Sequence, residues 1–260
     1  MKRARWYVAC MIIIVLLMLP HRAFAWGFEA AAGYWMQNPN GNVAFNGNGL
    51  LGSNLDLGLD LQFNTRYQPY VWAKVEFPWY LPNIYLMATP MKFDGTGQKN
   101  VSFTFGGHTF QANIPFESKL KMDHYDLTFY YSIPFLKRIT NDVLNVELGL
   151  DARAMDFEAN INQTTTGSSA QKSLWTVLPL GYGSIQIYPA KMVGFEAEFK
   201  GIFYGANNYM DIIGKIKILP YGPIEISVGH RYESFKADYG GNFKGNITIN
   251  GPFVEVGVKF

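Results

Sequence analysis

The chain has 260 residues, with 22 Lys and Arg against 20 Asp and Glu, which gives a formal net charge of +2. Four of the basic residues and none of the acidic ones lie in the first 25 positions, so the rest has 18 bases and 20 acids. This balance excludes the basic excess of a nucleic-acid-binding protein, and the single cysteine, Cys10, excludes disulfides in the rest of the chain.

The first 25 residues have the layout of a secretory signal peptide. Positions 1–5 are basic, an apolar run follows from Trp6 to Leu19, and Ala23-Phe24-Ala25 provides a small-x-small cleavage site. The alternative is an uncleaved anchor, but the run is shorter than the roughly 20 residues that span a bilayer. We therefore predict Sec-dependent export, cleavage after Ala25 and one domain over residues 26–260.

The composition of the remaining chain favours an all-β membrane protein. Hydrophobic residues make up 48% of the chain and aromatic residues 16%, whereas charged residues make up only 16%. No long uninterrupted apolar stretch follows residue 25, and many segments alternate apolar and polar residues with a period of two. This pattern, with 26 glycines, predicts a closed transmembrane antiparallel β-barrel.

Ten strand-like segments can be marked, and eight strands would result if 194–219 or the first hairpin were misread. The segments are 26–37, 66–77, 83–93, 118–132, 143–161, 172–188, 194–204, 208–219, 223–236 and 246–260. Short turns with proline alternate with connections that are mostly longer and polar, as in bacterial outer-membrane barrels with tight periplasmic turns. Both termini are then expected in the periplasm.

The last strand has one aliphatic face and ends in an aromatic residue. Val254, Val256, Val258 and Phe260 share this face, and Glu255 and Lys259 lie on the other. A terminal aromatic residue is the usual ending of bacterial outer-membrane barrels. We therefore expect these four residues to act as the signal that the barrel-assembly machinery recognises.

The opposite faces of the strands would point into the lumen. The predicted lumen charges number seven bases and eight acids, a near balance that favours mutual pairing and a filled lumen over a selective pore. We therefore predict a non-enzymatic outer-membrane barrel with a charge-filled lumen and surface loops for structural or ligand- and lipid-contact roles. A narrow channel for small solutes is the alternative. The residues of this predicted network are Lys74, Glu76, Asp126, Glu147, Asp151, Arg153, Glu196, Glu198, Lys200, Lys215, Lys217, Glu225, Arg231, Glu255 and Lys259.

Aromatic residues near the strand ends predict girdles at the two lipid interfaces. A soluble β-sandwich also alternates in this way, but it would gather its apolar face into one core. The predicted girdle residues are Trp26, Trp79, Tyr80, Tyr85, Tyr130, Tyr131, Tyr188, Tyr204, Tyr209 and Tyr221.

The sequence contains little that points to catalysis. His124 lies in Asp123-His124-Tyr125-Asp126, which permits a third hypothesis, a lipid or peptide hydrolase at the outer rim. We predict no catalytic residues, cofactor or metal site. In the loops, Phe103, Phe105 and Phe110 flank a Gly106-Gly107 turn and are expected to form a hairpin beyond the barrel rim. We favour phenylalanines that fold inward as a cap, and exposed phenylalanines that bind a ligand or lipid are the alternative. Residues 54–61 are expected to form a short lid or strand extension.

Several short stretches resemble one family of small proteobacterial outer-membrane β-barrel proteins without assigned function, the Gly-Gly outer-membrane type. They are Gly33–Trp35, Leu81–Ile84, Phe103–Phe110, Asp126–Tyr131, Leu148–Arg153 and Gly251–Phe253. The resemblance implies an outer-membrane barrel and carries no catalytic residues. The expected partners are outer-membrane lipids and lipopolysaccharide, without nucleic acid, and the oligomeric state is left open.

Overall fold

The computed structural model describes residues 27–205, 207–239 and 243–260. The predicted cleavage site at Ala23 and Ala25, Cys10 and Trp26 lie outside the described residues. The fold consists almost entirely of antiparallel strands, because nearly every described segment alternates inward-facing and outward-facing residues with a period of two.

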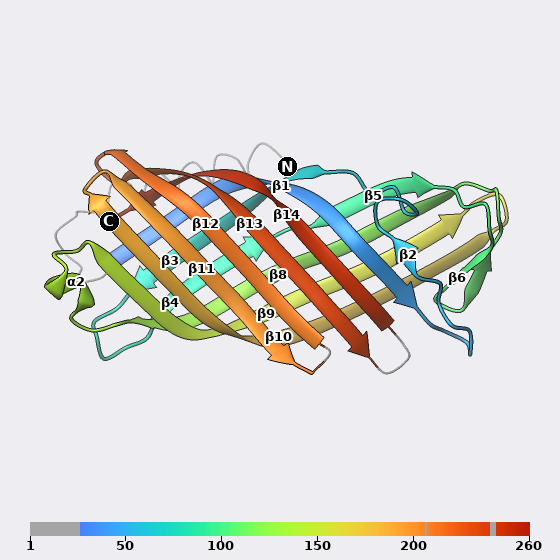
Figure 1. Ribbon diagram of the computed structural model, residues 1–260, viewed down its shortest axis with the longest axis horizontal. Helices are drawn as coiled ribbons and strands as arrows, with labels where there is room; N and C mark the ends of the chain where they lie inside the picture. The colour runs from blue at the N-terminus through green and yellow to red at the C-terminus, as the bar shows by residue number, and fades with distance from the viewer. Residues whose placement is uncertain (1–26, 206, 240–242) are drawn as a thin grey trace, which may run out of the picture.

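Ten strand positions close into one barrel, which confirms the predicted strand number (Figure 1). Each strand pairs with the next along the wall, and β1 pairs with β14 to close it. One position is shared by β4 and β5, which both pair with β8. The wall strands are β1 (Gly27–Phe45), β3 (Arg66–Glu76), β4 (Asn83–Thr89), β5 (Lys92–Gly97), β8 (Phe116–Ser132), β9 (Leu144–Gln163), β10 (Ser168–Ala190), β11 (Val193–Tyr204), β12 (Asn207–Tyr221), β13 (Ile224–Tyr239) and β14 (Phe243–Lys259).

The two rims of the barrel differ. At the terminal rim, the two ends of the described chain meet, and the amides of Phe28 and Phe260 each donate to the other residue's carbonyl, at 3.3 and 2.8 Å. The short helix α2 (Leu136–Ile139) lies at this rim, and β2 (Leu55–Asp56), β5 and β6 (Phe103–Phe105) lie at the opposite end, here called the lid rim (Figure 1). No helix among the described residues is long and apolar enough to cross a bilayer.

In the half next to the terminal rim, the barrel is apolar outside and charged inside. On β9, Leu148 and Leu150 are exposed, whereas Glu147 and Asp151, which flank them, are buried. On β14, Val254 and Val256 are exposed and Glu255 is buried. This arrangement reverses that of a water-soluble protein and fits a wall that faces hydrocarbon, so the sandwich alternative is wrong.

The polarity inverts part-way along the barrel, which the sequence analysis did not predict. Beyond Arg153 on β9, the inward residues Met155 and Phe157 are apolar, while the outward residues Asp156 and Glu158 are acidic. The same change occurs on β13 and β14, and we call its position the inversion level. Since a membrane strand needs only about 9–11 residues, the 20 residues of β9 reach well past the hydrocarbon.

A folded lid closes the barrel at the lid rim. Residues 55–63 bury Leu55, Leu57 and Leu61 against the apolar interior, and the hairpin of β6 and β7 (His108–Phe110) buries Phe103, Phe105 and Phe110. Gly106 and Gly107 form its turn at φ values of 61° and 87°, which glycine adopts without strain. The predicted hairpin with inward phenylalanines is therefore confirmed.

Two details of the sequence analysis are wrong. Tyr85, Tyr130 and Tyr209, predicted in the aromatic girdles, are buried inside the lumen, because they share the inward parity of the charged residues. The first strand runs to Phe45 rather than to residue 37, so the loop predicted over 38–65 begins as strand. The girdle residues that do face outward and are exposed are Trp79, Tyr80, Tyr131, Tyr204 and Tyr221.

Candidate functional site

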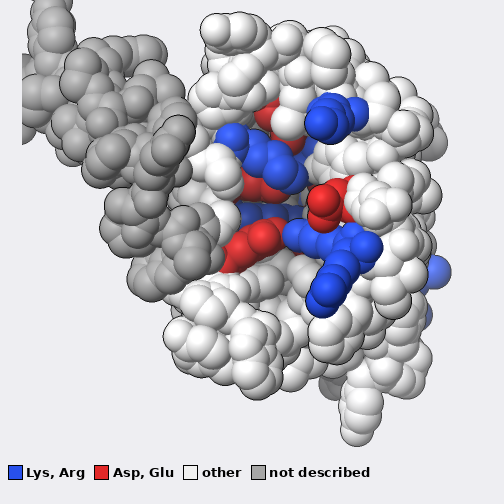
Figure 2. Space-filling view, turned by 90° about the vertical axis from the view of Figure 1, so that its left-hand side faces the viewer, with Lys and Arg blue, Asp and Glu red and all other residues white. Residues whose placement is uncertain are grey.

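The charged lumen is the most unusual feature of the molecule. Figure 2 looks into the barrel from the terminal rim and shows basic and acidic side chains gathered in a hollowed mouth. Of the fifteen charged residues predicted to face inward, Glu76 and Lys259 are half-buried at this rim, where they pair with Lys137 and Glu29. The structure buries the other thirteen inside the barrel.

The terminal cluster is centred on Glu196. Its carboxylate lies 2.9 Å from Nζ of Lys217, 3.2 Å from Nζ of Lys74 and 3.6 Å from Nζ of Lys215. Lys74 also lies 3.2 Å from Glu147, so one lysine joins carboxylates from two strands. The paired charges come from different strands, so these ion pairs form only when the barrel closes. A buried charge without its partner would be costly.

Glu255 of β14 shows how aromatic side chains complete the terminal cluster. The hydroxyl of Tyr70 and the indole N–H of Trp72 donate to its Oε2 at 2.6 and 2.9 Å. Lys215 donates to its Oε1 at 2.9 Å, and the ammonium of Lys215 lies 4.4 Å from the centre of the Trp72 ring. These contacts fix the orientation of the buried carboxylate.

A second group of charges, the arginine cluster, fills the middle of the barrel. Arg153 donates two hydrogen bonds to Asp126, at 2.6 and 2.7 Å, and a third to Asp211 at 2.7 Å. Arg231 donates to both oxygens of Asp211, at 2.9 and 2.7 Å. Lys200 donates to Asp126 at 2.7 Å. Paired donors of this kind hold carboxylates in fixed geometry.

His124 lies in this cluster rather than at the outer rim, so the predicted position of a hydrolase site is wrong. The ring is fully buried, its Nε2 is 3.1 Å from Nη2 of Arg231, and its Nδ1 is 3.8 Å from Glu233. Ligand atoms of His124, Asp211 and Glu233 lie within 4.8 Å of one another. Arg231 and Arg153 occupy both oxygens of Asp211, so guanidinium groups already supply the positive charge there.

The interior is more acidic than predicted. Among the described residues, six bases and ten acids are buried in the lumen, because the sequence analysis omitted Glu29, Asp211 and Glu233. Asp211 and Glu233 have the inward parity of predicted members on their strands: Asp211 lies four residues before Lys215, and Glu233 two residues after Arg231. Strict application of the period-two rule to β12 and β13 would have found Asp211 and Glu233.

These side chains fill the cross-section of the lumen. Arg153 and Arg231 are 0% and 2% exposed. Between the two clusters lies a space of about 10 Å³, lined by residues that include Trp35, Tyr85 and Met87. Such a space has room for about one water molecule.

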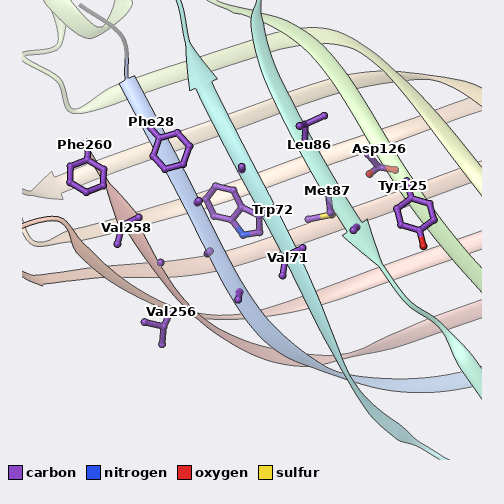
Figure 3. Close-up of a pocket in the computed structure, with 16 residues that line it drawn as sticks. Phe28, Val71, Trp72, Leu86, Met87, Tyr125, Asp126, Val256, Val258 and Phe260 are labelled. Atoms are coloured by element: carbon purple, nitrogen blue, oxygen red, sulfur yellow. The ribbon is translucent and has the colours of Figure 1, made fainter. Parts of the chain in front are cut away.

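The predicted assembly signal forms part of an outward-facing apolar groove. Figure 3 shows Val256, Val258 and Phe260 beside Phe28, Val71 and Leu86 along this groove, which has a volume of about 1010 Å³. Small residues on neighbouring strands form its floor, among them Ala30, Ala32, Ala73, Ala88 and Gly257. In a membrane, lipid chains would fill such a surface.

No protein-family model and no curated protein sequence matches this chain. Among solved structures, the translocator domain of the autotransporter NalP from Neisseria meningitidis is 10% identical, with 99% of this chain and 96% of that one covered and a TM-score of 0.43. The outer-membrane protease OmpT from Escherichia coli is 10% identical, with 92% of this chain and 99% of that one covered and a TM-score of 0.43. Ail, the attachment invasion locus protein of Yersinia pestis, is 10% identical, with 91% of this chain and 100% of that one covered and a TM-score of 0.37. These low values add no functional assignment.

Proposed function

We propose that this protein is a non-enzymatic integral protein of the bacterial outer membrane, with a sealed lumen, a folded lid and surfaces that contact lipids or small ligands. The observation that carries the proposal is the arginine cluster, in which two almost completely buried guanidinium groups share Asp211 across the barrel. Such a network stiffens the wall and leaves little room for solute.

The proposal includes a topology, with export by the Sec pathway, cleavage after Ala25 and both ends of the mature chain in the periplasm. The long lid would then face the outside, as longer loops do in bacterial barrels. The resemblance of the stretches quoted above supports membership of the Gly-Gly outer-membrane type. Folding by the barrel-assembly machinery would depend on Val254, Val256, Val258 and Phe260.

Planar-bilayer recording of the purified mature protein tests the sealed lumen. We expect no stable unit currents from the unmodified protein. Unit currents whose ion selectivity changes when Lys217→Glu or Glu198→Lys is introduced would contradict the proposal, because both residues lie in the terminal cluster.

A narrow cation channel is the second candidate, and the excess of buried acids over bases favours it. Rings of carboxylates give cation selectivity in membrane pores. If this candidate is correct, the same recordings give cation-selective currents, and Lys217→Glu strengthens the selectivity while Glu198→Lys weakens it.

Catalysis at His124 forms no part of the proposal, because its ring is enclosed between Arg231 and Met122. We expect a His124→Ala strain to keep its lipid A acylation pattern and its outer-membrane proteolysis. A loss of either activity, with the barrel still folded, would support the hydrolase hypothesis instead.

A further inference from the structure

An apolar pocket of about 420 Å³ lies at the inversion level, on the lid side of the arginine cluster. Its phenylalanine rings are in mutual contact: the ring of Phe243 has its centre 4.5 Å from that of Phe45 and 5.6 Å from that of Phe157. The apolar side chains that line it come from five strands and are Phe45, Met155, Phe157, Leu174, Phe235 and Phe243.

The barrel wall is incomplete beside this pocket. β10 pairs with β9 from Ser168 to Ile187, but its pairing with β11 ends at Gly181, and Ser168–Leu180 has no partner on that side among the described residues. Pro179 lies at the start of the unpaired stretch and has no N–H to donate to a neighbouring strand. β11 ends at Tyr204, whereas β10 continues toward the lid rim.

The side chains show that the pocket is accessible through this gap. Leu174 has the inward parity of β10 and lines the pocket, yet it is 47% exposed. Met155 and Phe157, which line the same pocket from β9, are 2% and 4% exposed. The pocket therefore opens laterally at β10 rather than through the lid.

The gap lies at the edge of the apolar outer surface. Trp175 and Val177 point outward beside it and are exposed, whereas the next outward residues toward the lid, Ser173 and Gln171, are polar. Tryptophan concentrates where hydrocarbon meets the polar interface. An acyl chain could therefore reach the pocket from the interfacial edge of the membrane, where Trp175 and Val177 lie.

Lys172 provides a positive charge at the same pocket. Lys172 lines the pocket on its lid side. Its aliphatic stem lies close to Gly106 in the β6–β7 turn, since a Cβ atom placed at position 106 would be only 3.3 Å from Cε of Lys172. Every lysine buried in the lumen has an ion-pair partner, whereas Lys172 has none among the described residues. An ammonium group above an apolar recess matches a chain with an anionic head.

We propose that this pocket binds a single-chain lipid carboxylate, a fatty-acid anion, which enters laterally past β10 with its chain among the phenylalanines and its carboxylate at Lys172. The order of the lining supports this orientation, because Lys172 lies on the lid side and Leu174 and Thr176 lie toward the membrane. This site is separate from the charged lumen, so it does not rest on the lumen being sealed.

Equilibrium binding of radiolabelled dodecanoate to the mature protein in lipid nanodiscs tests the site. We expect saturable binding, weakened about tenfold by Lys172→Gln, because a charge-assisted contact is lost. Binding of dodecanol, which has no charge, should not change in this variant. Leu174→Trp fills the pocket and should weaken both probes at least about tenfold.

Lys119→Gln is the matched control, because Lys119 is an exposed lysine on the outward face of β8. It should bind dodecanoate like the unmodified protein. Three results would overturn the proposal: no saturable binding to the unmodified protein, equal weakening by Lys172→Gln and Lys119→Gln, or unchanged binding after Leu174→Trp.

Discussion

Asp211 shows how much of the barrel interior depends on one side chain. Its two oxygens accept hydrogen bonds from Arg231 on β13 and Arg153 on β9, which lie on opposite parts of the wall. A buried ion pair adds little net stability when compared with apolar replacements, but removal of one partner strands the other charge. Without the Asp211 charge, Arg231 would be left with the more distant carboxylate of Glu233, at 3.4 Å, whereas Arg153 would keep Asp126 as its partner.

We therefore predict that Asp211→Asn destabilises the folded barrel by about 3–5 kcal/mol in a lipid-vesicle unfolding titration. Asp238→Asn is the control, because the carboxylate of Asp238 lies on the outer surface 3.7 Å from the exposed Lys244 and should contribute less than about 1 kcal/mol. Equal losses from the two substitutions would show that the arginine cluster does not form in the membrane.

The sequence could predict on which face of a strand each charged residue lies. Alternation of two residues per repeat assigned Lys74, Glu196 and Arg231 to the inward face, and the structure buries all three. Applied to Tyr209, the same rule gives the inward face, but Tyr209 was predicted in a girdle because it lies near a strand end, and that prediction is wrong. Which charges pair could not be predicted, because the partners of Glu196 come from strands far apart in sequence.

On the scale of single strands, the change of polarity along β14 marks where the hydrocarbon ends. Val254 and Val256 face outward on one side of this change, and Asn246 faces outward on the other. The sequence contained the signal, since the apolar residues of β9 shift from even positions at Leu148 and Leu150 to odd positions at Met155 and Phe157. The shift is overlooked when one face of β9 is assumed to be apolar along the whole strand.

This boundary predicts unequal costs for the same substitution on β14. Val256→Arg should destabilise the barrel by about 2–4 kcal/mol, because it places a charge in hydrocarbon. Asn246→Arg should change stability by no more than about 0.5 kcal/mol, because that side chain already meets water. The same vesicle unfolding titration measures both variants, and similar costs would contradict the boundary.

A substitution in the β6–β7 hairpin can show whether its buried phenylalanines hold the lid in place. Phe110 is fully buried and stacks on Phe103 with ring centres 5.0 Å apart. Phe110→Ala should destabilise the lid by about 3–5 kcal/mol and make the hairpin sensitive to added protease, while the barrel keeps its heat-modifiable gel shift. Val101→Ala, at an exposed position before the hairpin, should remain resistant.

The whole molecule combines two folding environments in one continuous sheet. Near the terminal rim, lipid covers the apolar exterior and the charges pair inside. Beyond the inversion level, water covers a polar exterior and the phenylalanines and aliphatic residues form the interior. The sequence predicted the ten strands and the closed barrel, because alternation persists throughout. It did not predict the lateral gap at β10, since strand pairing depends on the height that each hairpin reaches.

Spin-label accessibility along β9 tests this organisation most directly. The lone Cys10 lies in the predicted leader, so single cysteines can be introduced into the mature chain at outward positions 148, 150, 156 and 158. In bilayers, we predict that labels at 148 and 150 collide mainly with oxygen, which concentrates in hydrocarbon, and labels at 156 and 158 mainly with a water-soluble nickel chelate. Access of the nickel chelate at all four positions, or of oxygen at all four, would contradict a change from hydrocarbon to water between Leu150 and Asp156.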